Sequence, residues 1–131
     1  NPDSSIAICT LSSIDLLKKI SNSELLNQFS IAGRLLSENK GIDSIIKYLN
    51  QNKKVKTVIV CGKEVWGHKA GHSLFKLYEN GIDDHGRIVN SISPDPFLTT
   101  TKSEINYFQN EINLVNLINE TNIETIKKYV N

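Results

Sequence analysis

The chain has 131 residues, enough for one domain with a single hydrophobic core, so residues 1–131 are expected to form one unit. The net charge is +1 with 22% charged residues, so no strong field favours nucleic acid or an anionic membrane as a partner. No stretch approaches the roughly 18 consecutive apolar residues that span a bilayer, and no secretory signal is visible. Cys9 and Cys61 lie in apolar runs and are expected to be free thiols of a cytoplasmic protein.

The first part of the chain alternates short apolar runs, which predict strands, with amphipathic stretches, which predict helices. The first expected elements are a buried strand at residues 5–10, a helix capped by Ser12 or Ser13, and a helical fragment over residues 21–29 opened by a Ser21–Glu24 capping box. A strand at residues 31–36 and a helix from Ile42 to about Asn52 are expected to follow. Residues 31–36 are ambiguous between strand and helix, and an edge strand is preferred.

The apolar run from Val58 to Cys61 is the strongest strand signal. Such a run is typical of a strand buried on both faces, as in parallel sheets covered by helices. It ends at Gly62, and after a short loop a helix is expected from about His68 to Asn80-Gly81, a typical C-terminal cap. Ligands of parallel sheets bind outside the carboxyl ends of the strands, so this loop is the first candidate site.

The last third continues the alternation of elements. The expected elements are a turn at residues 83–86, a short strand at residues 87–90, a loop at residues 93–96 imposed by two prolines, and a helix opened by a Thr101–Glu104 capping box with Ile105, Phe108 and Ile112 inward. Residues 113–119 could prolong this helix, but a strand is preferred, because Thr121 and Glu124 cap a new helix through Tyr129 just afterwards. This order, without repeats, predicts an α/β fold: a Rossmann-like three-layer domain with a mostly parallel sheet.

Two histidines, His68 and His72, stand four positions apart near the expected helix start. On a helical wheel they fall on the flank of the apolar face, which favours contact with a ligand over burial in the core. Gly67 and Gly71 would let a large ligand approach the backbone, and a structural pair of histidines is the alternative. The wheel turns Ala70, Leu74, Leu77 and Tyr78 toward the sheet, places Phe75 on the flank, and turns Lys69, Ser73 and Lys76 away.

Other candidate chemistry has weaker support. Consecutive acids in a Gly-flanked turn usually face solvent, which argues against a metal site or a base at residues 83–85. Cys61 as a nucleophile lacks a cationic helix start that would lower the pKa of its thiol. The glycine patterns of dinucleotide-binding and P-loop sites are absent from the sequence, and His68-x-x-x-His72 lacks the adjacent Glu of zinc proteases.

The stretch CGKEVWGHKAGHSLFKLYENGIDDHGRIV resembles the corrinoid-binding A subunit of tetrahydromethanopterin S-methyltransferase from methanogenic archaea. The segments AICTLSS, IAGRLLSENKGID, Pro96-Phe97 and FQNEINLVNLIN match the same family in order. The resemblance implies a methyltransferase subunit of methanogenesis that carries a cobalamin, such as a 5-hydroxybenzimidazolyl-cobamide or a related corrinoid. Its cobalt would alternate between Co(I) and methyl-Co(III) as a methyl group passes from methyl-tetrahydromethanopterin to coenzyme M. The implied partners are other methyltransferase subunits, or a methyl donor or acceptor protein, without which the chain is expected to be inactive.

His68 matches the position of the family's cobalt-ligating histidine, so the resemblance makes it the lower axial ligand. His68-x-x-Gly71 also matches the HxxG core of the wider corrinoid-binding signature, but Trp66 stands where that signature has Asp. The acceptor for the other ring nitrogen is therefore expected from Ser12, Ser13 or Glu64. The expected cofactor contacts are Thr10, Leu11, Ser12, Ser13, Gly62, Glu64, Val65, Trp66, Gly67, His68, Gly71, His72, Pro94 and Phe97.

Membrane-bound members of the family carry a hydrophobic carboxyl-terminal anchor that this sequence does not show. The expectation is therefore a soluble cytoplasmic homologue or a soluble domain, with no membrane anchor in this chain. Two alternatives stay open: a small α/β interaction domain without a cofactor, and a simple metal-binding protein that uses His68 and His72.

Overall fold

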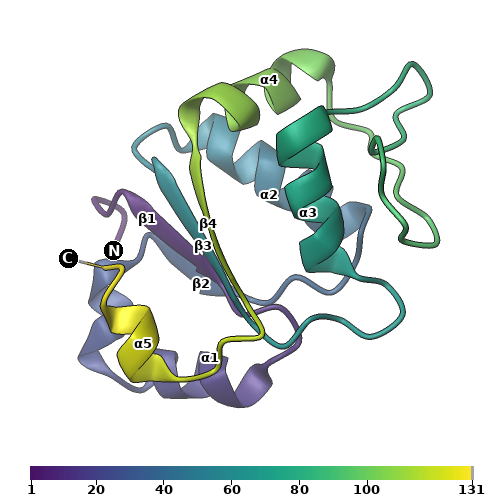
Figure 1. Ribbon diagram of the computed structural model, residues 1–131. Coiled ribbons are helices and arrows are strands. Elements are labelled where there is room, and N and C mark those ends of the chain that lie inside the picture. Colours follow the sequence, from purple (N-terminus) through teal and green to yellow (C-terminus); the bar gives the residue numbers. More distant parts are fainter. Residues whose placement is uncertain (131) are drawn as a thin grey trace.

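The computed structural model describes residues 1–130, which form a sheet between two layers of helices (Figure 1). The strand order is β2-β1-β3-β4, and every pairing is parallel. The strands are β1 (Ile6–Cys9), β2 (Ile31–Gly33), β3 (Thr57–Gly62) and β4 (Asn113–Ile118). The predicted Rossmann-like α/β fold with a parallel sheet is confirmed, and so is the preferred edge strand, although β2 is shorter than predicted.

Helices cover both faces of the sheet (Figure 1). One face carries α2 (Lys40–Gln51), α3 (Ala70–Asn80) and α4 (Lys102–Glu111); the other carries α1 (Ile14–Ser21), the short 3₁₀ helix η1 (Glu24–Gln28) and α5 (Ile123–Lys127). Along β3, Val58 and Val60 pack under α2, α3 and α4, whereas Ile59 and Cys61 pack against the opposite layer. Burial on both sides explains why this strand is apolar at successive positions. In the described part of the chain, each helix is too short or too polar to cross a membrane.

The loops that follow β1 and β3 are tied together at the carboxyl edge of the sheet. The backbone N–H and the hydroxyl of Ser12 both donate to the Lys63 carbonyl, at 3.1 and 2.8 Å, and the Lys63 N–H donates to Ser13 Oγ at 2.8 Å. Gly62 has a φ of +79°, and a Cβ there would collide with the Thr10 carbonyl. Only glycine allows this close approach of the two loops.

Two predicted helix caps are wrong, and a third, Ser13, is confirmed in position but not in its hydrogen bond. Ser21 is the last residue of α1, and Ser23 caps η1 instead by accepting from the Leu25 N–H. Ser13 stands at the start of α1, but its hydroxyl accepts from Lys63 rather than from the helix. Asn122, not Thr121, caps α5. The Thr101–Glu104 capping box is confirmed in both directions, and Ile105, Phe108 and Ile112 are buried as predicted.

The segment between α3 and α4 is irregular. The strand predicted at residues 87–90 is wrong, because only isolated antiparallel bridges form, between Ile82 and Ile88 and between Arg87 and Phe97. Asn90, with a φ of +67°, ends the extended backbone there. Asp83 Oδ1 accepts from the backbone N–H groups of His85 and Arg87, and these hydrogen bonds lower the pKa of its carboxyl below the ordinary value. This carboxylate therefore holds a turn, the interpretation favoured from the sequence.

Candidate functional site

His68 lies in a turn at the carboxyl end of β3 rather than in a helix. The turn is closed by a 2.9 Å hydrogen bond from the Lys69 N–H to the Val65 carbonyl, and α3 begins at Ala70 after Lys69 adopts a φ of +49°. The predicted helix start at His68 is therefore two residues too early. The turn leaves the His68 side chain 59% exposed.

A buried carboxylate holds the His68 ring. Glu38, in the loop between β2 and α2, is 1% exposed, and its Oε1 lies 3.1 Å from His68 Nδ1. Its other oxygen accepts from the Asp95 N–H at 3.0 Å. Burial raises the pKa of Glu38, but hydrogen bonds from its own N–H, from Asp95 and from His68 outweigh burial, so the pKa is lowered overall. A charged carboxylate at Nδ1 favours the tautomer with its proton there and leaves a lone pair on Nε2.

The predicted acceptors for the His68 ring are wrong, because each is engaged elsewhere. The Ser12 hydroxyl donates to the Lys63 carbonyl, and the Ser13 hydroxyl accepts from the Lys63 N–H. Glu64 accepts from the backbone N–H groups of Gly71 and His72, at 3.0 and 2.7 Å, and so stabilises the start of α3. Sequence reasoning missed Glu38, although one signal was present: it follows the predicted edge strand, whose carboxyl end must lie on the same edge of a parallel sheet as that of β3.

His72 binds a different partner from His68. Its Nε2 accepts from the Ile92 N–H at 3.1 Å. Burial, together with the nearby Lys76 and Lys69 ammonium groups, lowers the pKa of His72, although the Glu64 and Glu79 carboxylates raise it. Within residues 1–130 no group of three or more potential ligands is placed to hold a metal ion. Nothing in this arrangement favours a site in which both histidines bind one metal.

Three hydroxyls fasten the segment 91–97 to α3. Ser73 Oγ lies 2.6 Å from both Ser91 Oγ and Ser93 Oγ, and the Ser93 hydroxyl donates to the Lys69 carbonyl at 3.2 Å. The outward orientation predicted for Ser73 is wrong, because this segment covers that side of α3 and buries the serine. The orientations predicted for Ala70, Leu74, Leu77 and Tyr78 are confirmed.

Three loops meet around His68: residues 34–39, 63–69 and 91–97. They are joined through Glu38, which contacts both His68 and the Asp95 N–H. Each loop exposes a large apolar side chain: Leu36 is 45% exposed, Trp66 95% and Ile92 67%. A depression of about 390 Å³ lies in the segment from Glu64 to Lys69. Exposed apolar groups gathered around one polar group are typical of a binding surface.

The predicted contact residues differ in exposure. Thr10, Leu11, Gly62, Val65 and Gly71 are buried, Ser12, Ser13, Glu64 and His72 are half-buried, and Trp66, Gly67, His68, Pro94 and Phe97 are exposed. A Cβ at Gly71 would lie 3.0 Å from both Glu64 Oε2 and Ile118 Cδ1, so this glycine serves the packing of α3 on the sheet. At Gly67, φ is +81° and no neighbour lies within 4 Å of a Cβ, which leaves the backbone open to a ligand. That any of these residues contacts a cofactor stays a prediction.

Neither cysteine is positioned to act as a nucleophile. Burial raises the pKa of Cys9 and of Cys61 to about 12. The Cys61 thiol donates to the Cys9 carbonyl at 3.4 Å inside the sheet. Both thiols are therefore protonated at neutral pH, which excludes the nucleophile considered at Cys61.

The whole chain, residues 1–131, matches the family model for the A subunit of tetrahydromethanopterin S-methyltransferase. One relative, the A subunit of the "Putative methyltransferase Mtx" of Methanosarcina barkeri, is 38% identical over 131 residues. Another, A subunit 1 of the "Tetrahydromethanopterin S-methyltransferase" of Methanothermobacter thermautotrophicus, is 33% identical over 132 residues. Each alignment covers 99% of this chain, but 62% of the first relative and 53% of the second. The chain thus spans between half and two thirds of the length of these two relatives.

Proposed function

Because this chain belongs to the A-subunit family of tetrahydromethanopterin S-methyltransferase, we propose that it is a corrinoid-binding methyl carrier in which His68 ligates the cobalt from below. The observation that carries this proposal is the pair of His68 and Glu38. A buried, charged carboxylate on Nδ1 of a histidine whose side chain is more than half exposed would prepare Nε2 to bind a metal.

The residues around His68 fit a large, flat cofactor. Imidazole nitrogen is a suitable axial ligand, and a corrinoid, when bound, supplies a cobalt centre that takes up a methyl group and later releases it. Trp66 and Ile92 offer apolar surface to the edge of the macrocycle. The open backbone at Gly67 lets the ring approach closely.

The chain's own part in the reaction is to hold the cofactor and to tune it. The Glu38 carboxylate favours the His68 tautomer with its proton on Nδ1, so the Nε2 lone pair would be available to hold a cobalt ion. A hydrogen bond from Nδ1 to a carboxylate also makes the imidazole a stronger donor. The segment 91–97 braces Glu38 through the Asp95 N–H, which limits movement of the carboxylate.

The proposed reaction passes a methyl group from methyl-tetrahydromethanopterin through this carrier to coenzyme M. Support comes from the family description and from the relatives' names, which join tetrahydromethanopterin to transfer of a methyl group onto sulfur. We assign binding of the two substrates to other subunits, because the relatives are named as subunits. The proposed role of this chain is that of the carrier between them.

Titration of the purified chain with a cobamide tests the proposal. A stoichiometric complex should form, with a visible spectrum shifted from that of the free cofactor, and His68→Ala should reduce the shift. A complex whose spectrum is the same in the wild type and in His68→Ala would remove His68 as the ligand. Absence of any complex would favour the alternative of an α/β interaction domain without a cofactor.

A further inference from the structure

The outer edge of the sheet at β4 has no neighbouring strand. β4 is the last strand in the order β2-β1-β3-β4, and no strand among residues 1–130 pairs with its outer side. The helices that precede and follow it, α4 and α5, pack on the two faces of the sheet rather than along this edge (Figure 1). An unpaired edge presents a row of backbone donors and acceptors that a further strand can bind.

Alternate residues of β4 direct their backbone groups to this outer edge. The N–H groups of Asn113 and Asn119 donate to carbonyls in and next to β3, so the residues at even-numbered positions point away from β3. In the stretch that the structure describes, no group binds the N–H or the carbonyl of Leu114 or Asn116. The Ile118 N–H donates to Asn116 Oδ1 at 3.1 Å, within the same strand.

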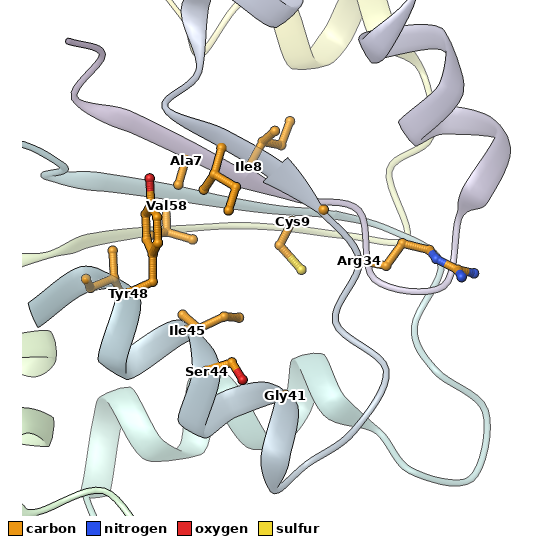
Figure 2. Close-up of a pocket in the computed structure, with 12 residues that line it drawn as sticks. Ala7, Ile8, Cys9, Arg34, Gly41, Ser44, Ile45, Tyr48 and Val58 are labelled. Carbon is orange, nitrogen blue, oxygen red and sulfur yellow. The ribbon is translucent and has the colours of Figure 1, made fainter. Parts of the chain in front are cut away.

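β4 lacks the features that usually protect the edge of a sheet. Natural edge strands are kept short, or they carry charged residues or proline. The opposite edge follows this rule, because β2 has three residues and the exposed Arg34 comes next, at the end of the groove between β2 and α2 (Figure 2). β4 has six residues, NLVNLI, without charge or proline. Such a sequence is typical of a strand that has a neighbour on each side.

We propose that β4 pairs in antiparallel orientation with β4 of a second copy of this chain, about a two-fold axis at Asn116. In this register, the outward-facing groups of Leu114 lie opposite those of Ile118 in the second copy, and the two residues exchange N–H···O hydrogen bonds. Asn116 exchanges the same bonds with its own counterpart. The Ile118 N–H leaves the Asn116 side chain and donates to the Leu114 carbonyl of the second copy.

The side chains match in the same register. Residues that lie opposite each other in antiparallel strands point to the same face of the sheet and interact. Leu114 and Ile118 both pack on the face that α3 and α4 cover, and Val115 and Leu117 both pack on the face that α5 covers. Val115, Leu117 and Ile118 are only half-buried in the single chain, so pairing would cover more of their apolar surface.

A neighbouring register fits less well. With the axis one residue earlier, Leu114 would lie opposite Asn116, and the Ile112 carbonyl would have to accept from the second copy. That carbonyl already accepts from the Tyr78 hydroxyl at 2.6 Å. β4 itself is uncharged, so no like charges oppose each other within the paired strands.

The dimer leaves the surface beside His68 accessible. Antiparallel pairing reverses the direction of the strands in the second copy, so the two carboxyl edges, each with its His68, lie at opposite ends. A pair of six-residue strands is a small interface compared with the ~1,200–2,000 Å² of stable complexes. The dimer should therefore exchange with the monomer at micromolar concentrations.

A charge pair at the axis tests this register. Asn116 is exposed, so Asn116→Lys and Asn116→Asp should fold, which circular dichroism checks. Each variant alone places like charges opposite each other, and its dimer Kd from sedimentation should rise about 5-fold or more. A 1:1 mixture of the two variants places opposite charges there and should dimerise at least as tightly as the wild type. Asn106→Lys adds the same charge on the exposed side of α4 and should leave the Kd unchanged.

NMR of a mixture of isotope-labelled and unlabelled copies gives an independent readout. The Hα atoms of Val115 and Leu117 lie close together in a pair that is not hydrogen-bonded, so a nuclear Overhauser effect between them across the two copies is expected. A chain that stays monomeric at millimolar concentration would overturn the dimer and leave the edge to a strand of another protein. A Kd unchanged in Asn116→Lys, or a mixture that does not restore association, would overturn the pairing at Asn116. No corrinoid enters the experiment, so its result is independent of the proposed function.

Discussion

The Glu38 carboxylate lies 3.1 Å from His68 Nδ1 although 30 positions separate the two residues in the chain. The parallel sheet brings them together, because β2 and β3 flank β1 and their carboxyl ends lie on one edge. Glu38 lies in the loop that follows β2, and His68 lies in the turn that follows β3. Their contact gives the otherwise exposed imidazole a fixed partner, and with it a defined position for its proton.

Replacing Glu38 by Gln should redistribute the His68 proton between the two ring nitrogens and weaken metal ligation by roughly 10- to 100-fold. The amide keeps an acceptor for the Asp95 N–H but removes the charge that favours the Nδ1 proton. Nitrogen chemical shifts of the His68 ring measure the tautomer without any cofactor. Glu64→Gln is the control, because Glu64 contacts backbone N–H groups instead of the ring. An unchanged tautomer in Glu38→Gln would contradict the assigned role.

Two glycine substitutions should differ in their cost. Gly62→Ala should lower the free energy of unfolding by more than about 2 kcal/mol, because a positive φ and a collision with the Thr10 carbonyl act together. Gly67→Ala should cost only about 1–2 kcal/mol, since φ is also positive there but the space is open. Urea unfolding measures both values. Equal losses of unfolding free energy in the two variants would mean that the packing of the loops after β1 and β3 contributes nothing to stability.

Stability should fall on acidification through the titration of His72. The pKa of His72 is lowered in the folded state, so as the pH falls through about 6.5 the unfolded chain binds the proton first. The free energy of unfolding should therefore decrease from about pH 7 downward, until the folded state also binds that proton. His72→Gln keeps an acceptor for the Ile92 N–H but cannot titrate, and urea unfolding should show a shallower slope with pH. The same slope in both proteins would exclude His72 as the source.

The two thiols should resist alkylation in the native state. Burial raises the pKa of each to about 12, and the thiolate is the reactive form. At pH 8, modification should proceed no faster than the structure opens, and it should accelerate in urea at the unfolding midpoint. Mass spectrometry after timed quenching measures both sites. Rapid modification of Cys61 in native buffer would contradict its placement inside the sheet.

Apolar patterns predicted the sheet and most helices because burial imposes the pattern directly. Val58–Cys61 is apolar at each position because both faces of β3 are covered, and Ile42, Ile46 and Leu49 are the buried stripe of α2. Helix caps were predicted less well, because a serine hydroxyl can form its hydrogen bond with a residue far away in the sequence instead of with the helix that it precedes. Ser13 accepts from Lys63, fifty positions away, rather than from its own helix.

The location of His68 at the carboxyl edge of the sheet was predicted, but its contact with Glu38 was not. The rule for parallel sheets located the edge, and His68 lies there with one ring nitrogen held. Its partner Glu38 was missed because the contact joins two loops whose conformations depend on tertiary packing. Ser73 was placed outward because a helical wheel carries no information about an irregular segment, here residues 91–93, that covers the helix.

The identity of the axial ligand is tested most directly by electron paramagnetic resonance of the protein with a bound Co(II) corrinoid. Protein labelled with nitrogen-15 only at histidine changes the nitrogen splitting of the cobalt signal if a histidine is the ligand, and leaves it unchanged if the cofactor's own base is. We predict that the label changes the splitting in wild type and in His72→Ala, and that His68→Ala loses the histidine splitting. Loss of this splitting in His72→Ala with retention in His68→Ala, or a wild-type signal insensitive to the label, would contradict ligation by His68.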